Sequence, residues 1–297
     1  MYICSRILRI MKLSIITINY NNAVGLQKTV QSVVEQMPCD LEVEHIIIDG
    51  NSTDESVSII KDYARDIEEK SLHLALTWLS EPDKGIYNAM NKGIRMASGE
   101  YVQILNSGDC LASASVIKAM YDALEKHQYP PILYGNMLKT SDWKHFTKDD
   151  CGAHSDYTPQ SFLYFYNGTL NHDCAYIRRQ LFDEFGFYNE TMKICSDWEW
   201  YVRAIVLGKT PTVYVDIDVT KFDMNGISER NGENKRLIQH ERRAYLEETL
   251  PPAILADYDK YTFPIMQYQR LKKYHLWDVA YFIERVLFKL EKWGFLR

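Results

Sequence analysis

Two short stretches of this 297-residue sequence place carboxylates just after an apolar run. Residues 48–54 read Ile-Asp-Gly-Asn-Ser-Thr-Asp, and residues 104–109 read Ile-Leu-Asn-Ser-Gly-Asp. Strands of an α/β sheet end in this way, and ligands collect at the carboxyl ends of such strands. The two stretches therefore indicate a site for a ligand that is cationic or rich in hydroxyl groups.

A nucleotide-sugar bound with a divalent metal ion has both properties. Ribose and uracil present hydroxyl and N–H donors, so a carboxylate at a strand end suits them as an acceptor. Asp49 and, after a later apolar run, Asp83 are the candidates. Thr17 and Asn19, at the end of the first apolar run, would face the same crevice. The alternatives are turn chemistry for the two aspartates, since Asp-Gly and Pro-Asp are common in turns, and an ordinary strand end for the other two.

The diphosphate of such a donor needs its charge neutralised as it leaves, and Mg²⁺ or Mn²⁺ held by oxygen ligands supplies this. Asp109 is the candidate metal ligand, and Asn106 lies close to it in the chain. Electrostatic stabilisation of a leaving group is often the largest catalytic contribution. The alternative is that Asn-Ser-Gly-Asp forms a plain turn, for which this composition is frequent.

The acceptor hydroxyl must lose a proton as it attacks, and its base has to come from another element across the site. Residues 195–200 read Cys-Ser-Asp-Trp-Glu-Trp, which puts Asp197 at a helix start among large aromatic residues. Asp197 is the candidate general base, and Trp198 would fix its geometry by packing. Glu199 and His172 are candidates for contacting the acceptor or supporting the base. The alternatives are helix capping by Asp197, a solvated Glu199 and a structural histidine.

The elements that would position these residues alternate in the first half of the chain. Apolar, β-branched runs predict strands, and apolar residues at helical spacing predict the helices between them. Asn22 can cap the first helix, and Ser52 with Glu55 forms a capping box expected to open the second. The alternation predicts an α/β fold with parallel strands and right-handed crossovers. The expected strands are 13–18, 43–48, 74–79, 101–105, 132–134 and 212–217.

The second half of the chain is less regular. Residues 140–169 mix polar residues, glycine and proline with aromatics, and long irregular segments inside compact domains are often functional. A helix is expected at 198–207. The expected organisation is a catalytic domain over 1–230, with a nucleotide-binding half at about 12–110 and an acceptor half at about 111–230, and a helical extension over 231–297.

Composition and charge narrow the class of protein. The net charge of −6 argues against a general nucleic-acid binder. The six cysteines are scattered, with no C-x-x-C pair and no Cys/His cluster, so we expect neither a zinc site nor a disulfide framework. Such cysteine usage is typical of a reducing compartment, and we therefore expect a cytoplasmic location. The apolar segment 1–10 is interrupted by Arg6 and Arg9 and is too short to span a bilayer. We expect these ten residues to be dispensable or to arise from an upstream start codon.

Together these motifs resemble the family-2 glycosyltransferases. The matching stretches occur in the family's order within residues 12–230, and they are Ser14–Asn21, Ile48–Asp54, Ser80–Gly93, Leu105–Asp109 and Ser196–Trp198. The resemblance implies a GT-A fold, which is a Rossmann-like, mostly parallel sheet with helices on both faces. It also implies an inverting hexosyltransferase that uses a nucleotide-sugar, here expected to be a UDP-sugar, and a divalent metal. In this family Asp49 and Asp83 would lie at the nucleoside and Asp109 at the metal. Asp197 would be the base.

The sequence departs from the family in its metal motif, which is usually Asp-x-Asp. Asn106 and Gly108 stand where acidic residues often occur, which leaves Asp109 alone. Because magnesium keeps several waters, one carboxylate with two phosphates can still hold it. We therefore expect weak metal affinity without nucleotide.

The C-terminal segment from residue 270 is basic and aromatic, although the whole chain is acidic. Its apolar side chains follow helical spacing at Val279, Phe282, Ile283, Val286, Leu287, Leu290 and Trp293. A basic amphipathic helix can lie in a membrane surface, and bacterial relatives often act on lipid-linked glycans. The alternatives are a helix packed on the catalytic domain and a dimer contact.

The leading hypothesis is an inverting glycosyltransferase of polysaccharide biosynthesis, cytoplasmic or peripheral on the inner face of the membrane, that extends a glycan or lipid-linked glycan. A sugar nucleotidyltransferase is less favoured, because residues 19–22 lack the Gly-rich, basic loop that holds a triphosphate. A glycan-binding or scaffold protein without catalysis is the third hypothesis. The incomplete acidic motif favours it, whereas Asp197 argues against it.

Overall fold

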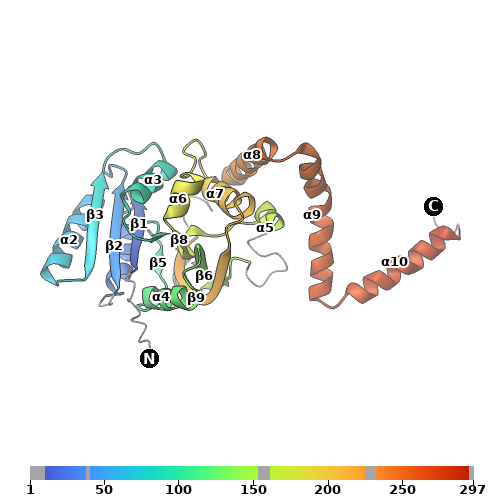
Figure 1. Cartoon of the computed structure of the whole chain (residues 1–297), viewed down its shortest axis with the longest axis horizontal. Coiled ribbons are helices and arrows are strands. Elements are labelled where there is room, and N and C mark those ends of the chain that lie inside the picture. The colour runs from blue at the N-terminus through green and yellow to red at the C-terminus, as the bar shows by residue number, and fades with distance from the viewer. Residues whose placement is uncertain (1–10, 38–40, 153–160, 225–231, 294–297) are drawn as a thin grey trace, which may run out of the picture. The chain divides into compact units, whose positions relative to one another are not determined.

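The computed structural model describes residues 11–37, 41–152, 161–224 and 232–293 (Figure 1). The chain divides into two compact units, Met1–Arg242 and Arg243–Arg297. Within the described residues, the first unit holds a nine-stranded sheet surrounded by helices, and the second unit is helical. Sequence alternation therefore predicts the α/β class correctly.

Four parallel strands form the first half of the sheet, as the sequence predicts. Their order in the sheet is β3-β2-β1-β4, and their bounds are β1 (Lys12–Asn19), β2 (Glu42–Asp49), β3 (Leu74–Ser80) and β4 (Tyr101–Ile104). They are connected in turn by α1 (Ala23–Val34), α2 (Ser56–Glu69) and α3 (Ile86–Met96). In the register Asn19 lies beside Asp49, and Asp49 beside Ser80, so the carboxyl ends of β1, β2 and β3 are level.

Helices cover both faces of this half of the sheet, and the alternation of side chains along a strand decides which residues they meet. On one face, a Cβ on Gly93 of α3 would lie 2.3 Å from Ile16 Cγ2, so the close approach of α3 to the sheet requires glycine. On the other face, the hydroxyl of Tyr63 on α2 lies 3.0 Å from His45 Nδ1. Figure 1 shows β3, β2 and β1 side by side, in cyan to blue, with α3 close to β1.

The second half of the sheet is mixed in direction, with short antiparallel pairings beside one long parallel one. Its strands are β5 (Cys110–Leu111), β6 (Ile132–Thr140), β7 (Thr147–Asp149), β8 (Ala175–Arg178) and β9 (Thr212–Asp223). β8 is antiparallel to β4 and to β6, β9 is parallel to β6, and β5 and β7 pair antiparallel with β9 and β6. β9 runs past its expected end at residue 217, which brings Asp223 beside the turn that carries Asp109.

The remaining elements of the first unit are short. They are α4 (Val116–Lys126), α5 (Phe162–Asn167), the 3₁₀ turn η1 (His172–Cys174), α6 (Gln180–Phe185), α7 (Ser196–Tyr201) and the π-helical turns of η2 (Val202–Leu207). The helix expected at 198–207 thus begins at Ser196 and changes its winding after Tyr201. Asn22 caps α1 as expected, accepting the Gly25 N–H at 3.2 Å. The expected capping box is wrong, because α2 begins at Ser56 and the Ser52 hydroxyl is used by Asp49 instead.

Over residues 232–293 the structure describes the helices α8 (Gly232–Thr249), α9 (Pro252–Lys273) and α10 (Trp277–Lys292). Residues of α8 up to Arg242 belong to the first unit, and the rest to the second. α10 buries none of its side chains fully, although the ring of Trp277 packs edge-on against Tyr268 of α9, with 4.2 Å between centroids. Across the described ranges, every helix is too short or too polar to cross a bilayer.

Candidate active site

A line of hydrogen bonds joins the carboxyl ends of the four parallel strands. The hydroxyl of Ser107, in the turn after β4, donates to Asn19 Oδ1 at 2.7 Å. The Asn19 amide donates to Asp49 Oδ1 at 2.8 Å, and Ser80 at the end of β3 donates to the other oxygen of Asp49 at 2.7 Å. The structure therefore brings Asn19 and Asp49 together, and it links both to the turn that leads to Asp109.

Asp49 is fully buried, and its carboxylate oxygens accept hydrogen bonds from other groups of the protein. In addition to Asn19 and Ser80, the Ser52 N–H donates to Oδ2 at 3.0 Å and the Ser52 hydroxyl to Oδ1 at 2.5 Å. Burial raises the pKa of this carboxyl, but the four donors outweigh it, so the pKa lies below its usual value. Asp49 holds the strand ends in place here, and its contact with a nucleotide stays a prediction.

Asp83 and Thr17 lie in different surroundings. Asp83 lies beside the end of β2, since a Cβ on Gly50 would be 3.1 Å from Asp83 Oδ2. Its Oδ1 pairs with Lys92 Nζ at 2.5 Å. Thr17 is fully buried, with its hydroxyl oxygen 2.8 Å from His45 Nε2, so it points into the layer between the sheet and α2 and away from the strand ends. Asp83 therefore joins the candidate group and Thr17 does not.

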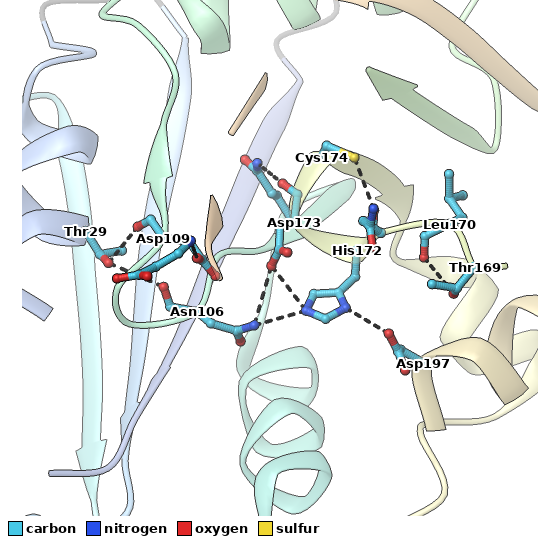
Figure 2. A network of polar contacts seen from close by, with 12 residues as sticks. Thr29, Asn106, Asp109, Thr169, Leu170, His172, Asp173, Cys174 and Asp197 are labelled. Carbon is cyan, nitrogen blue, oxygen red and sulfur yellow. Dashed lines mark hydrogen bonds and ion pairs between the residues drawn. The ribbon is translucent and has the colours of Figure 1, made fainter. Parts of the chain in front are cut away.

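The turn after β4 carries Asp109, which is 5% exposed. Thr29 of α1 anchors the turn by donating its hydroxyl to the Asp109 carbonyl at 2.7 Å (Figure 2). Asp109 Oδ1 accepts the backbone N–H of Asp223 at 3.1 Å. Burial and then the charge of Asp173, with a smaller contribution from the charge of Asp223, raise the pKa of Asp109 well above its usual value. The charges of two carboxylates from other elements therefore oppose the ionisation of Asp109.

His172 connects this acidic group to a second carboxylate on another element (Figure 2). Its Nε2 lies 3.2 Å from Asp173 Oδ1 and 3.1 Å from the side-chain nitrogen of Asn106. Its Nδ1 lies 3.3 Å from Asp197 Oδ2. Burial lowers the pKa of the ring, but Asp173 and Asp197 outweigh burial and raise it well above its usual value. The ring therefore lies between two carboxylates, whose charges favour its protonated form.

Asp197 lies in the first turn of α7, as the sequence predicts, and its side chain is 17% exposed. The hydroxyl oxygen of Tyr87, on α3, lies 3.1 Å from Asp197 Oδ1. Burial raises the pKa of this carboxyl, but the hydrogen bond and charge of His172 outweigh it, so the pKa lies below its usual value. Asp197 is thus an ionised, oriented and partly exposed carboxylate, which is what a proton acceptor requires.

Trp198 and Glu199 hold α7 in place. Trp198 is 1% exposed, and its indole N–H donates to the Phe165 carbonyl at 2.7 Å. Glu199 forms an ion pair with Arg203 at 2.9 Å, and Arg203 in turn donates to the Phe187 carbonyl at 2.9 Å. These partners support the helix that carries Asp197, and contact of either residue with an acceptor stays a prediction.

Asp173, Asp223 and Tyr87 belong to this group of side chains, although the sequence motifs assign them no role. The sequence could have pointed to Asp173, because it directly follows His172, and to Tyr87, because it lies inside the motif at residues 80–93. Asp223 has no local signal, because only the long pairing of β9 with β6 and β5 brings it to Asp109.

The side chains around Asp109 are of the type that a hard divalent cation needs. Carboxylate and amide oxygens are the ligands that Mg²⁺ prefers, and the buried Oδ1 of Asn106 has no hydrogen-bond partner. In the part of the chain that the structure describes, however, no three His, Cys, Asp or Glu side chains are arranged to hold a metal by themselves. The residues therefore fit a metal that takes most of its ligands from phosphate and water.

Curated relatives of this chain are bacterial glycosyltransferases. It is 26% identical over 213 residues to the PGL/p-HBAD biosynthesis glycosyltransferase of Mycobacterium bovis, a match that covers 72% of this chain and 77% of the relative. It is 29% identical over 214 residues to an uncharacterized glycosyltransferase of Mycobacterium tuberculosis, covering 72% of this chain and 76% of the relative.

Solved structures share the fold at low sequence identity. Staphylococcus aureus TarS superposes with a TM-score of 0.59 at 20% identity, over 82% of this chain but only 41% of the TarS chain. TarS 1–349 in complex with UDP-GlcNAc gives a TM-score of 0.56 at 19% identity, over 82% of this chain and 69% of that one. The mannosyltransferase PcManGT of Pyrobaculum calidifontis, in complex with GDP-Man and Mn²⁺, gives 0.55 at 18% identity, over 81% and 66%. These likenesses establish the GT-A fold.

The family model of glycosyl transferase family 2 matches residues 14–186, which is more than half of the chain. That range contains most of β1, all of β2 to β4, the turn that carries Asp109, and His172 with Asp173. Fold, relatives and family model agree, and the chain therefore belongs to glycosyl transferase family 2 and is a glycosyltransferase.

Proposed function

We propose that this enzyme moves a sugar from a UDP-sugar to a hydroxyl of a glycan or lipid-linked glycan in polysaccharide biosynthesis, with inversion at the anomeric carbon. The line of contacts from Asp109 through Asn106 and His172 to Asp197 carries the proposal. It joins an acidic turn at the strand ends to an ionised carboxylate on α7. Donor phosphates at one end and an acceptor hydroxyl at the other would then share one site.

The side chains divide the reaction between them. The acceptor oxygen bonds to the anomeric carbon while the bond from that carbon to the diphosphate breaks on the opposite face, and the hydroxyl proton passes to Asp197. His172 and Tyr87 keep the Asp197 carboxylate in place for that transfer. Asn19, Asp49 and Asp83 lie where the nucleoside would bind.

Asp109 would hold Mg²⁺ or Mn²⁺ together with oxygens of the diphosphate. A bound divalent ion there would offset the negative charge that develops on the leaving group. Its charge would also relieve the repulsion that raises the pKa of Asp109. PcManGT, a structural neighbour, is solved with GDP-Man and Mn²⁺, and TarS with UDP-GlcNAc, which supports both the metal and a nucleotide-sugar donor.

The donor and the acceptor would bind mainly to different halves of the catalytic domain. We assign residues 12–110 to the nucleotide-binding half and 111–230 to the acceptor half of a catalytic domain, followed by the helical extension from 231. His172 of the second half contacts Asn106 of the first, and Asp197 of the second half contacts Tyr87 of the first.

A thermal-shift screen tests the donor assignment, because a ligand that binds the folded state raises its apparent stability. We expect UDP with Mn²⁺ to raise the melting temperature more than GDP or ADP does, and a chelator to remove most of the shift. UDP release from UDP-GlcNAc, UDP-glucose and UDP-galactose, with and without Mn²⁺, then identifies the donor. A larger shift with GDP would overturn the choice of UDP, and no shift with any nucleotide would overturn the donor site.

We also propose that α10 lies on an anionic membrane surface. Seven Lys and Arg residues and three Asp and Glu residues occur from residue 270 to the end of an otherwise acidic chain. The apolar stripe of α10 is exposed: Phe282 is 67% accessible, Ile283 52% and Val286 40%. α10 itself carries three basic and three acidic residues, so the basic excess that would face an anionic surface comes from its neighbours, among them Arg270, Lys272 and Lys273 at the end of α9.

A further inference from the structure

Glu241 of α8 binds three consecutive backbone N–H groups of the loop that leads into Asp197. Its Oε1 accepts from the N–H of Lys193 at 2.6 Å, and its Oε2 accepts from those of Ile194 at 3.1 Å and Cys195 at 3.0 Å. Hydrogen bonds to an ionised acceptor are stronger than those between neutral groups. One carboxylate thus fixes three successive peptide groups, and Asp197 follows two residues later.

The same loop is held from other directions as well. Tyr87 of α3 donates its hydroxyl to the Ile194 carbonyl at 2.5 Å, in addition to its contact with Asp197. From α8, the Ile238 carbonyl accepts from Cys195 Sγ at 3.7 Å, and the guanidinium carbon of Arg242 lies 5.0 Å from the centroid of the Trp198 ring. The loop is therefore clamped between α3 and the first part of α8.

α7 needs this external support because its own sequence does not supply it. Its N-cap residue, Cys195, makes no side-chain capping bond, and the helix is only six residues long before the π-helical turns begin. A short uncapped helix is marginal on its own. The orientation of Asp197 against His172 and Tyr87 therefore depends on groups outside α7.

We propose that Glu241 is a positioning residue for the base of this transferase. The inference rests on the proposed role of Asp197, and it gives α8 a part in the reaction. Without the carboxylate, the three N–H groups lose their acceptor, the loop relaxes, and Asp197 leaves its contacts with His172 and Tyr87. A displacement of about 1 Å at a reacting group can cost roughly a hundredfold in rate.

Glu241→Gln tests the proposal, with Glu248→Gln, at an exposed position on the same helix, as the matched control. Hydrogen exchange followed by mass spectrometry reports on the amides of residues 193–195. We expect about tenfold or faster exchange of these amides in E241Q, because local opening governs their protection, and no change in E248Q. This measurement needs no substrate.

UDP release from UDP-GlcNAc, UDP-glucose and UDP-galactose with Mn²⁺, together with calorimetric binding of UDP, gives the functional result. For a positioning role, kcat falls about tenfold or more in E241Q while the Kd for UDP stays near that of the wild type. In an Asp197→Asn background the same change lowers kcat little further, since residues that act as a unit are not additive.

Unchanged exchange at residues 193–195 in E241Q would overturn the proposal. So would a loss of UDP affinity equal to the loss of kcat, or an undiminished effect of E241Q in the Asp197→Asn background. Unchanged UDP release in Asp197→Asn alone would instead overturn the base assignment, while the exchange result would still show whether Glu241 holds the loop.

Discussion

Asp109 is surrounded by acidic groups that its own turn does not contain. Within the turn Asp109 is the one carboxylate, since Asn106, Ser107 and Gly108 are neutral. Asp173 from η1 and Asp223 from the end of β9 supply negative charge in the folded protein, and that charge raises the pKa of Asp109. The acidity of the proposed metal site is thus distributed over distant segments of the chain.

Asp109→Asn should weaken UDP binding in the presence of Mn²⁺ by about tenfold or more, because a metal ligand contributes several kcal/mol at such sites. The amide keeps an oxygen for the Asp223 N–H and nearly the shape of the carboxyl group, so the melting temperature without metal should change little. Calorimetry of UDP with Mn²⁺ and with chelator measures the effect, and Asp122→Asn on the surface of α4 is the control. Equal UDP binding with metal and with chelator in the wild type would contradict the proposed role of Asp109 as a metal ligand.

Side chains at the ends of paired strands could be predicted from the sequence, whereas those set by long-range packing could not. Asn19 and Asp49 meet because parallel strands end at one edge, and the apolar runs reveal both strands. Thr17 lies two residues earlier on the same side of β1 and was expected at the same crevice. Its hydroxyl instead forms a hydrogen bond with the buried His45 of β2. Asp223 required knowledge of how far β9 pairs with its neighbours, and the residue pattern does not contain that information.

At the scale of elements, one side chain can either cap a helix or bond to a neighbouring turn, and the choice decides where the helix begins. Ser52 and Glu55 have the spacing of a capping box, yet the Ser52 hydroxyl donates to Asp49, which is buried and ionised. Satisfying a buried carboxylate outweighs capping a helix whose end is exposed, because an unpaired buried charge costs more than a lost cap. The helix therefore begins at Ser56.

The opposite ends of the strands carry a second buried carboxylate. Glu44 accepts from the Ser14 hydroxyl at 2.5 Å and the Gly99 N–H at 3.0 Å, and it pairs with Lys12 at 2.7 Å. Burial raises the pKa of Glu44, but these partners and Ser98 outweigh it and lower the pKa from 4.5 to about 2. Because the pKa in the folded state is the lower one, Glu44 stabilises the fold above its unfolded pKa, and that stability is lost as the pH falls toward 2.

Glu44→Gln should therefore lower the free energy of unfolding at pH 7 by up to about 3 kcal/mol, the equivalent of the pKa shift. The difference from wild type should shrink below pH 4.5 and be small near pH 2. Urea unfolding at several pH values measures it, with Glu42→Gln, exposed at the start of the same strand, as the control. A difference that is the same at pH 7 and pH 3 would show that lost packing, rather than the charge, is responsible.

At the scale of the whole molecule, the candidate site draws on both halves of the first unit. The strand ends and Asp109 come from residues before β5, whereas His172, Asp197 and Asp223 come from η1, α7 and β9. The parallel half could be predicted because each crossover is local in sequence. The mixed half could not, because β8 and β6 pair over long sequence separations that no local pattern specifies.

The membrane proposal for α10 also belongs to this scale. Phe282→Asp should reduce binding to vesicles of phosphatidylglycerol and phosphatidylcholine by about tenfold or more, since burying a Phe side chain contributes about 2 kcal/mol. Phe282→Leu keeps an apolar side chain at this 67% exposed position and should bind nearly as the wild type does. Co-sedimentation measures both variants.

Binding should also fall at high salt and on vesicles without the anionic lipid. Equal vesicle binding by Phe282→Asp and wild type would contradict the proposal. Suppose that the wild-type protein does not bind vesicles and that Phe282→Asp is a smaller species than the wild type in solution. The apolar stripe would then be a contact between two copies of the chain.

The most direct measurement is made on Asp197→Asn, because the central claim is that Asp109 and Asp197 serve the donor and the acceptor within one site. We predict that calorimetric binding of UDP with Mn²⁺ stays near the wild-type value while UDP release falls by about 10²–10⁴-fold, as expected for a lost general base. Asp183→Asn, at an exposed position of α6, should change neither quantity. UDP release at the wild-type rate from Asp197→Asn would contradict the claim.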